Sequence, residues 1–432
     1  MTRPTLVLLL TAAALVAAAP ARAQFAGAAA PRPMTPLFGP GRPTGEQSLD
    51  LSLATFGGYD TNVVEDDPGS IIDPRTQRSG SFSGLNARLA YVRKFRRVSF
   101  GLTGDSALRY YGGGSDILGM QHAAGASFDV ALERTHINVG QTLAFVPFYS
   151  FSTLPVLFTG AVGDVLAPNA DQSIVRRDER LYATFVTVSR SIGERLLATA
   201  SGSLQGADFS RDSTAMRNLS GMARLSYGLT KNLSLVAGYG ASEATYREPL
   251  RDRQRFRTHS VDAGLMFNRP LSLTRRTTLG VTAGTTAIQD ESGITQYRLI
   301  ADARLNREIG RTWHATAAYH RGVGFVEGFL QPFYTDSLNL SVGGLFGSRV
   351  EATVTGGYTN GEMGLGTTTR TESYSGTTRL RVALSREVAL SAQYLLYRYR
   401  FDQADLLPGL LPPYLERQGL RIGLDVWLPL VR

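Results

Sequence analysis

The chain has 432 residues and no cysteine, which excludes disulfide scaffolds and thiolate metal sites. Its 46 glycines, 18 tyrosines and 19% charged residues fit strands and turns better than helices. The formal net charge is +9, and only Lys94 and Lys231 are lysines, so arginine carries almost all of the positive charge. The arginines are scattered singly along the predicted strands and are not clustered, which argues against nucleic acid as a partner.

The first residues of the chain have the pattern of a secretory signal peptide. Arg3 precedes a short apolar run, and Ala-Arg-Ala stands directly before Gln24, so residues 1–23 are expected to be cleaved on export. The run is too short and wrongly flanked for a spanning helix. Residues 24–47 are rich in Ala, Pro and Gly and are expected to form a flexible periplasmic lead-in. A barrel domain is then predicted over residues 48–432.

The segment 420–432 alternates apolar and polar residues without a gap. Its even-numbered positions are apolar as far as Leu430, whereas Arg421, Gly423 and Asp425 fall on the other side. Because successive side chains of a strand point to opposite faces, one face is apolar and the other is mostly polar. Such a segment of about ten residues at the end of a chain is typical of the closing strand of a membrane β-barrel.

The same alternation recurs from residue 48 onward, between connections that are short and long in turn. The long ones include 150–176, 247–255, 324–332 and 402–416. About eight short and nine long connections imply about eighteen strands, or about sixteen if a pair near Tyr334 is misread. The prediction is an all-β, transmembrane, antiparallel up-and-down β-barrel with short periplasmic turns and longer outer loops. A soluble β-sandwich or propeller would need strands of about five or six residues, and these are longer.

Residues at the strand ends support this prediction. Tyr227, Phe267, Trp313 and Phe346 lie towards the apolar face on the short-turn side, as the aromatic girdle of a membrane barrel does. Arg321 shares the apolar parity but lies near the outer end of its strand, where it is expected to reach lipid head groups.

Polar side chains on the opposite face are expected to line the lumen, which at this strand number is wide enough for a water channel. Rings of basic side chains favour anions, so one interpretation is a weakly anion-attracting pore. The alternative is that these arginines and carboxylates only pair with each other across neighbouring strands. The pore-lining residues predicted from the alternation are Arg88, Asp105, Arg109, Asp129, Arg224, Asp262, Asp302, Arg304, Arg379, Arg381, Arg421 and Asp425.

The longest outer loop, 150–176, is unusually apolar and must bury its side chains somewhere. Folding inward would narrow the pore, whereas folding outward would cover a neighbouring loop or protomer. The inward arrangement is favoured. The candidate constriction residues are Leu154, Leu157, Phe158, Val162 and Val165.

The sequence offers no catalytic or metal-binding motif, so neither an enzyme nor a cofactor is expected. His314 and His320 face inward on one strand but are six residues apart, roughly 20 Å, which is too far to share a metal. A barrel acyl hydrolase would require a serine within hydrogen-bond reach of one of these histidines.

The first predicted strand and its loop, residues 53–67, read LATFGGYDTNVVEDD. With Tyr59, Asp60 and Asn62, the segment resembles the opening of a loosely defined, uncharacterised family of porin-like outer-membrane β-barrels. The resemblance covers nearly the whole mature chain in overall plan. It implies a porin-like protein of the kind often associated with polysaccharide export. The chain departs from the usual barrel in lacking a terminal aromatic residue, since it ends Pro429-Leu430-Val431-Arg432.

We therefore expect a channel in a Gram-negative outer membrane for passive diffusion of small polar or anionic solutes. The alternative is a non-conducting or gated barrel that serves exopolysaccharide export or the cell surface as a scaffold. The expected partners are outer-membrane lipid and lipopolysaccharide, the barrel-assembly machinery and, in a homo-oligomer, further copies of the chain.

Overall fold

The computed structural model describes residues 46–62, 79–112, 117–150, 173–209, 215–248, 251–267, 277–326, 329–365, 369–403 and 412–431. The predicted signal peptide, nearly all of the predicted lead-in and the five candidate constriction residues between 154 and 165 lie outside these ranges, so those expectations stay predictions. No helix in the described part of the chain is long and apolar enough to cross a membrane.

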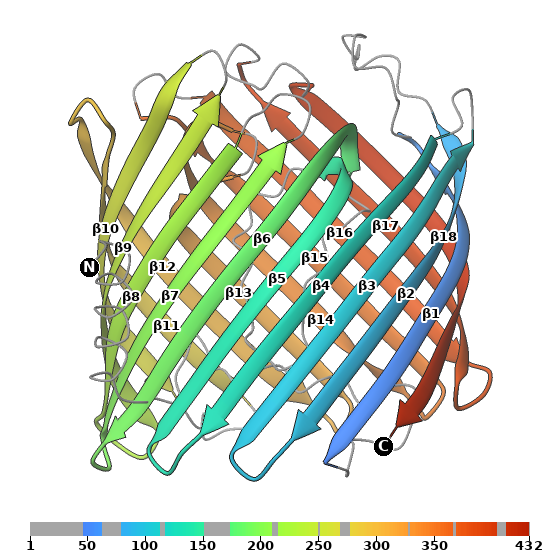
Figure 1. Ribbon diagram of the computed structural model, residues 1–432, viewed down its shortest axis with the longest axis horizontal. Coiled ribbons are helices and arrows are strands. Elements are labelled where there is room, and N and C mark those ends of the chain that lie inside the picture. The colour runs from blue at the N-terminus through green and yellow to red at the C-terminus, as the bar shows by residue number, and fades with distance from the viewer. Residues whose placement is uncertain are drawn as a thin grey trace, which may run out of the picture.

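Eighteen long strands make up the described structure, and each pairs antiparallel with its sequence neighbours (Figure 1). The predicted count of eighteen is confirmed, and the alternative of sixteen is wrong. The strands are β1 Gln47–Asp60, β2 Gly80–Lys94, β3 Val98–Gly112, β4 Ile117–Ala131, β5 Thr135–Ser150, β6 Ser173–Ile192, β7 Leu196–Phe209, β8 Ala215–Gly228, β9 Leu233–Glu248, β10 Arg251–Phe267, β11 Thr277–Gln289, β12 Thr295–Ile309, β13 Trp313–Gly324, β14 Phe333–Phe346, β15 Val350–Met363, β16 Thr369–Ala383, β17 Val388–Phe401 and β18 Tyr414–Val431.

The sheet closes on itself because β1 pairs with β18 as well as with β2. Leu49 lies opposite Val431 at one end of this seam, and Asp60 lies opposite Gly419 at the other. Closure leaves no unpaired edge strand. The predicted transmembrane, up-and-down antiparallel barrel is therefore confirmed.

The two faces of the wall follow the predicted alternation. In β18, Leu420 and Ile422 are 53% and 56% exposed on the outside, whereas Arg417 and Asp425 face inward and are 2% and 9% exposed. At the short-turn end of the outer wall, the indole of Trp313 packs edge-on against Phe346 at 4.6 Å between ring centroids. The outer wall therefore presents an apolar surface edged by aromatic rings, the arrangement that a bilayer requires.

One predicted loop is mostly strand. The sequence favoured a long connection over 247–255, but β9 continues to Glu248 and β10 begins at Arg251. Glu243 of β9 pairs across the hairpin with Arg257 of β10 at 3.1 Å and with Arg255 at 3.5 Å. Charged residues here extend the ladder beyond the apolar band, so polarity was a poor guide to where pairing stops.

Candidate functional site

The predicted pore-lining residues lie on the face of their strands opposite the exposed apolar side chains. Their role in conduction stays a prediction, but their partners are clear. Most of them form ion pairs or hydrogen bonds across neighbouring or nearby strands. The pairs are Arg88–Asp105 at 3.8 Å, Arg224–Asp262 at 2.7 Å, Arg379–Asp425 at 2.8 Å, His136–Asp129 at 2.8 Å, His320–Asp302 at 2.6 Å and Arg381–Glu351.

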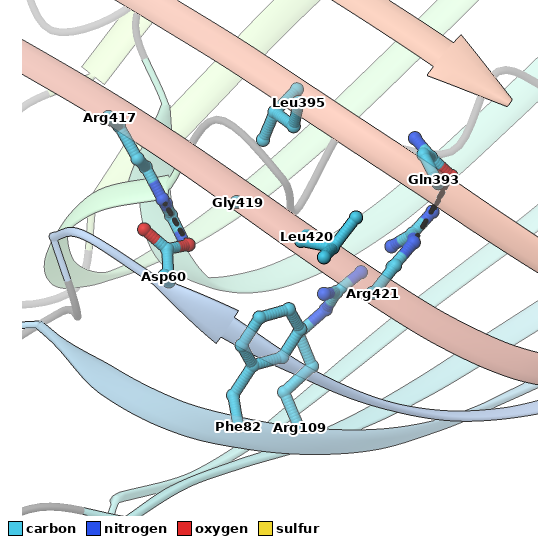
Figure 2. A pocket seen from close by; sticks show the side chains of 9 residues that line it. All are labelled: Asp60, Phe82, Arg109, Gln393, Leu395, Arg417, Gly419, Leu420 and Arg421. Atoms are coloured by element: carbon cyan, nitrogen blue, oxygen red, sulfur yellow. Dashed lines mark hydrogen bonds and ion pairs between the residues drawn. The ribbon is translucent and has the colours of Figure 1, made fainter.

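The seam between the first and last strands holds a second group of inward-facing side chains (Figure 2). The guanidinium of Arg417 contacts one carboxylate oxygen of Asp60 through both Nε, at 2.7 Å, and Nη2, at 2.6 Å, and both side chains are almost fully buried. The backbone N–H of Thr61 donates to the carbonyl of Gln418 at 2.9 Å. Asp60 therefore fastens the start of the barrel to its end.

Arginine and aromatic rings stack beside this ion pair. The guanidinium groups of Arg109 and Arg421 lie 5.0 Å and 4.9 Å from the centroid of the Phe56 ring. Arg421 also donates to the side-chain carbonyl of Gln393, through Nε at 3.1 Å (Figure 2). Cation–π contacts of this kind hold arginines against the wall. Arg109 of β3 and Arg421 of β18, both predicted to line the pore, therefore have fixed positions beside the seam.

The described residues between β13 and β14, 325–326 and 329–332, which we name the constriction segment, contact side chains on distant parts of the inner wall. Phe325 lies 6.4 Å from Tyr246 of β9 and 6.3 Å from Phe256 of β10, between ring centroids. Phe329 lies 5.8 Å from Phe401 of β17. β9 and β17 each stand four places from β13 along the closed ring, on opposite sides. A segment that touches both strands must therefore extend from the wall across the lumen.

Two buried apolar clusters anchor this segment. The first joins Val326 and Phe329, both at most 6% exposed, to side chains of β7, β14, β15, β17 and β18. The second packs Phe325 and Leu330 against buried residues of β8 to β11 and against Leu365 of the β15–β16 connection. The members of the first cluster are Ala207, Phe209, Val326, Phe329, Phe333, Met363, Tyr397, Tyr399, Phe401 and Leu415.

The inward position of this segment was not predicted from the sequence; the 150–176 loop, which was expected to fold inward, lies largely outside the described residues and stays a prediction. A signal was present, because the predicted connection 324–332 contains Phe325, Val326, Phe329 and Leu330. A short outer loop with this many apolar side chains has to bury them, and the inside of the barrel is the nearest place.

His320 and His122 each bond to a polar side chain of a neighbouring strand. The ring of His320 bonds to Asp302, and the hydroxyl of Ser337 donates to the backbone carbonyl of His320, at 3.3 Å, instead of to its ring. The hydroxyl of Ser106 bonds to the ring of His122 at 3.0 Å, but on the outer wall. Within the described ranges, no cluster of three or more His, Asp or Glu side chains could hold a metal ion.

Comparisons with known proteins give only distant similarity. No family model matches the chain, and no curated protein is similar to it in sequence. Among solved structures, OpdQ of Pseudomonas aeruginosa is similar at 12% identity with a TM-score of 0.45, covering 89% of this chain and 98% of that one. OccK11 (OpdR) of the same organism has 12% identity, a TM-score of 0.42 and coverages of 89% and 97%.

The FrpB iron transporter of Neisseria meningitidis is similar at 7% identity with a TM-score of 0.45, covering 88% of this chain and 81% of that one. The strand pairing of this chain itself shows its fold.

Proposed function

We propose that the protein is a porin-like channel through which small polar solutes diffuse passively across a bacterial outer membrane. The short turns would face the periplasm and the long connections the outside, as in other barrels of this membrane. The apolar outer wall and the predicted signal peptide support this location. A closed ring of eighteen strands encloses a lumen of the width that porins use.

The constriction segment is the observation that carries this proposal. A wide, polar lumen by itself would pass many solutes, and a segment that crosses it limits their size. Phe325 and Phe329 touch strands on either side of β13, and this fixes the position of the segment within the lumen. The constriction predicted for the 150–176 loop lies outside the described residues and stays a separate prediction.

A second candidate function is a gated or non-conducting barrel that acts as a scaffold in exopolysaccharide export or at the cell surface. The same feature favours it, because the first apolar cluster joins β7 and β17, which lie ten places apart one way around the ring and eight the other. Contacts between almost opposite walls would close the passage if the segment stayed in place.

Single-channel conductance in a planar bilayer decides between the two functions. The refolded protein would be compared with a variant carrying Phe325→Ser and Phe329→Ser, which keeps the chain length and removes the ring contacts. A second variant lacking residues 154–168 tests the constriction predicted from sequence. Heat-modifiable gel mobility verifies that each barrel is folded.

Stable steps in the intact protein that grow in the Phe325→Ser and Phe329→Ser variant would support a channel constricted by this segment. Silence in the intact protein with large steps in this variant would support the gated barrel. Silence in all three folded proteins would overturn the channel proposal. Growth only in the 154–168 deletion would transfer the constriction to the other loop.

A further inference from the structure

A row of uncharged polar side chains runs along the inside of six consecutive strands. Register pairs connect each member to the next across β11 to β16, so all of them point into the lumen. None of the six is among the buried side chains. We name this the β11–β16 row, and it consists of Thr278, Asn306, Thr316, Ser341, Thr355 and Thr377.

Hydrogen bonds join part of this row into a chain. The Thr316 hydroxyl donates to the side-chain carbonyl of Asn306 at 3.1 Å, and the Asn306 amide donates to the Thr278 hydroxyl at 3.5 Å. Hydroxyls both donate and accept, so each can exchange its partner for a solute group of either kind. The row is therefore a surface on which a hydroxylated molecule could replace water without loss of hydrogen bonds.

A second row lies on β7 to β10, on the short-turn side of the constriction segment's contacts. Ser203, Ser220, Ser242 and Thr258 are register partners in succession. The hydroxyls of Ser203 and Ser220 are 2.7 Å apart, and those of Ser242 and Thr258 are 2.6 Å apart. We name this the β7–β10 row. Together the two rows follow ten of the eighteen strands, all neighbours in the ring.

The inward-facing charges of these ten strands are largely neutralised. Arg224 and Asp262 pair at 2.7 Å with side chains about a tenth exposed. Arg381 contacts both Glu351 and, at 3.9 Å, Asp425. An ion that leaves water needs compensating charge, and paired charges supply little of it. This part of the wall is therefore poorly suited to concentrating anions or cations.

We propose that the solutes of this channel are uncharged and rich in hydroxyl groups, such as sugars or polyols. The inference rests on the proposed channel function and narrows it from small polar or anionic solutes to neutral ones. Uncharged hydroxyl rows exchange hydrogen bonds with such solutes on the short-turn side of the constriction segment, whereas the paired arginines and carboxylates leave little net charge on these strands to draw ions.

Liposome swelling tests this preference with sorbitol as the neutral probe, sodium gluconate as an anion and glucosamine hydrochloride as a cation of similar size. Sorbitol is expected to enter faster than either ion, and the reversal potential in a KCl gradient is expected to lie near zero. Faster entry of gluconate with a strong anion preference would overturn the inference while leaving the channel intact.

Two sets of substitutions test whether the preference for neutral solutes depends on the β11–β16 row. Thr316→Val, Ser341→Ala and Thr355→Val together remove three hydroxyls of the β11–β16 row and should lower the ratio of sorbitol entry to KCl conductance several-fold. Thr285→Val with Thr378→Val, which remove hydroxyls from the lipid-facing side of the same region, should leave this ratio unchanged. An equal fall in both variants, or in neither, would contradict the role of the row.

The reversal-potential measurement needs a positive control and a variant in which the constriction segment no longer contacts the wall. Glu351→Gln removes the nearest carboxylate of Arg381 and should move the reversal potential towards anion preference, which shows that the measurement detects the loss of one lumenal carboxylate. Repeating the reversal potential in the Phe325→Ser and Phe329→Ser variant keeps the inference testable if the intact barrel is silent. Strong anion preference in that opened barrel would again overturn it.

Discussion

The seam between β1 and β18 and the constriction segment are both buried inside the barrel, but they are held by opposite chemistry. At the seam, Asp60 and Arg417 bury two charges against each other. At the constriction, Phe325 and Phe329 bury only apolar rings. A buried charge is tied to one partner, whereas apolar contacts can separate and form again without leaving a charge behind. The seam is therefore suited to permanent closure and the constriction to control of passage.

Among the variants that test this difference, removal of Asp60 should cause the largest loss of barrel stability. Asp60→Ala leaves Arg417 buried without its carboxylate, and breaking such a pair costs about 3–5 kcal/mol. The free energy of unfolding should fall by about 3–5 kcal/mol. It can be measured by urea titration of the refolded barrel in detergent, with tryptophan fluorescence as the signal. Asp60→Ala with Arg417→Ala should recover part of the loss. A single variant as stable as the parent would show that the ion pair does not fasten the seam.

Phe329→Ala should have an intermediate effect, and it should release the constriction segment instead of unfolding the barrel. Loss of a buried phenylalanine costs about 3–5 kcal/mol where the whole fold depends on it, but here the segment can detach while the strands stay paired. We expect little change in the temperature at which the barrel unfolds, measured by the shift in its gel mobility on heating. Protease cleavage within 325–332 should increase. Phe346→Ala, on the outer wall, is the matched control. A large drop in barrel stability without new cleavage would refute this separation.

Glu243→Ala should have the smallest effect. Its pairs with Arg255 and Arg257 lie at the outer surface, where the three side chains are between 34% and 52% exposed. Exposed pairs contribute about 0.2–1 kcal/mol, and salt screens them. The change in unfolding free energy should be of that size in dilute buffer and disappear in concentrated salt. A loss of stability as large as that of Asp60→Ala would show that the exposed pairs of Glu243 contribute as much as the buried ion pair of the seam.

The fold was predictable because its rules are local. Alternation assigned Leu420 and Ile422 to the outside and Arg421 to the inside, and the turn pattern gave the number of strands. The limits of the strands were less certain at the β9–β10 hairpin, where Arg255 and Glu243 extend pairing beyond the apolar band.

The candidate site was predictable only in part, because its contacts cross the ring. No local pattern brings Phe329 to Phe401 or Phe325 to Tyr246, since those contacts exist only after the sheet has closed. The apolar content of the segment indicated burial but not its partners. The β11–β16 row and the β7–β10 row could not be predicted from the sequence for the same reason. Thr316, Ser341 and Thr355 are single hydroxyls on separate strands until register aligns them.

The seam also sets an order of events during folding. Asp60 and Arg417 are separated by 357 positions in the sequence, so their bond forms only when both ends of the barrel are present. Contacts between such distant residues carry a large loop-closure entropy and come late. Each hairpin from β2 to β17 can form earlier from neighbouring residues. Until β18 has joined the sheet the ring is therefore incomplete, and Arg417 of this last strand completes the ion pair with Asp60 of the first.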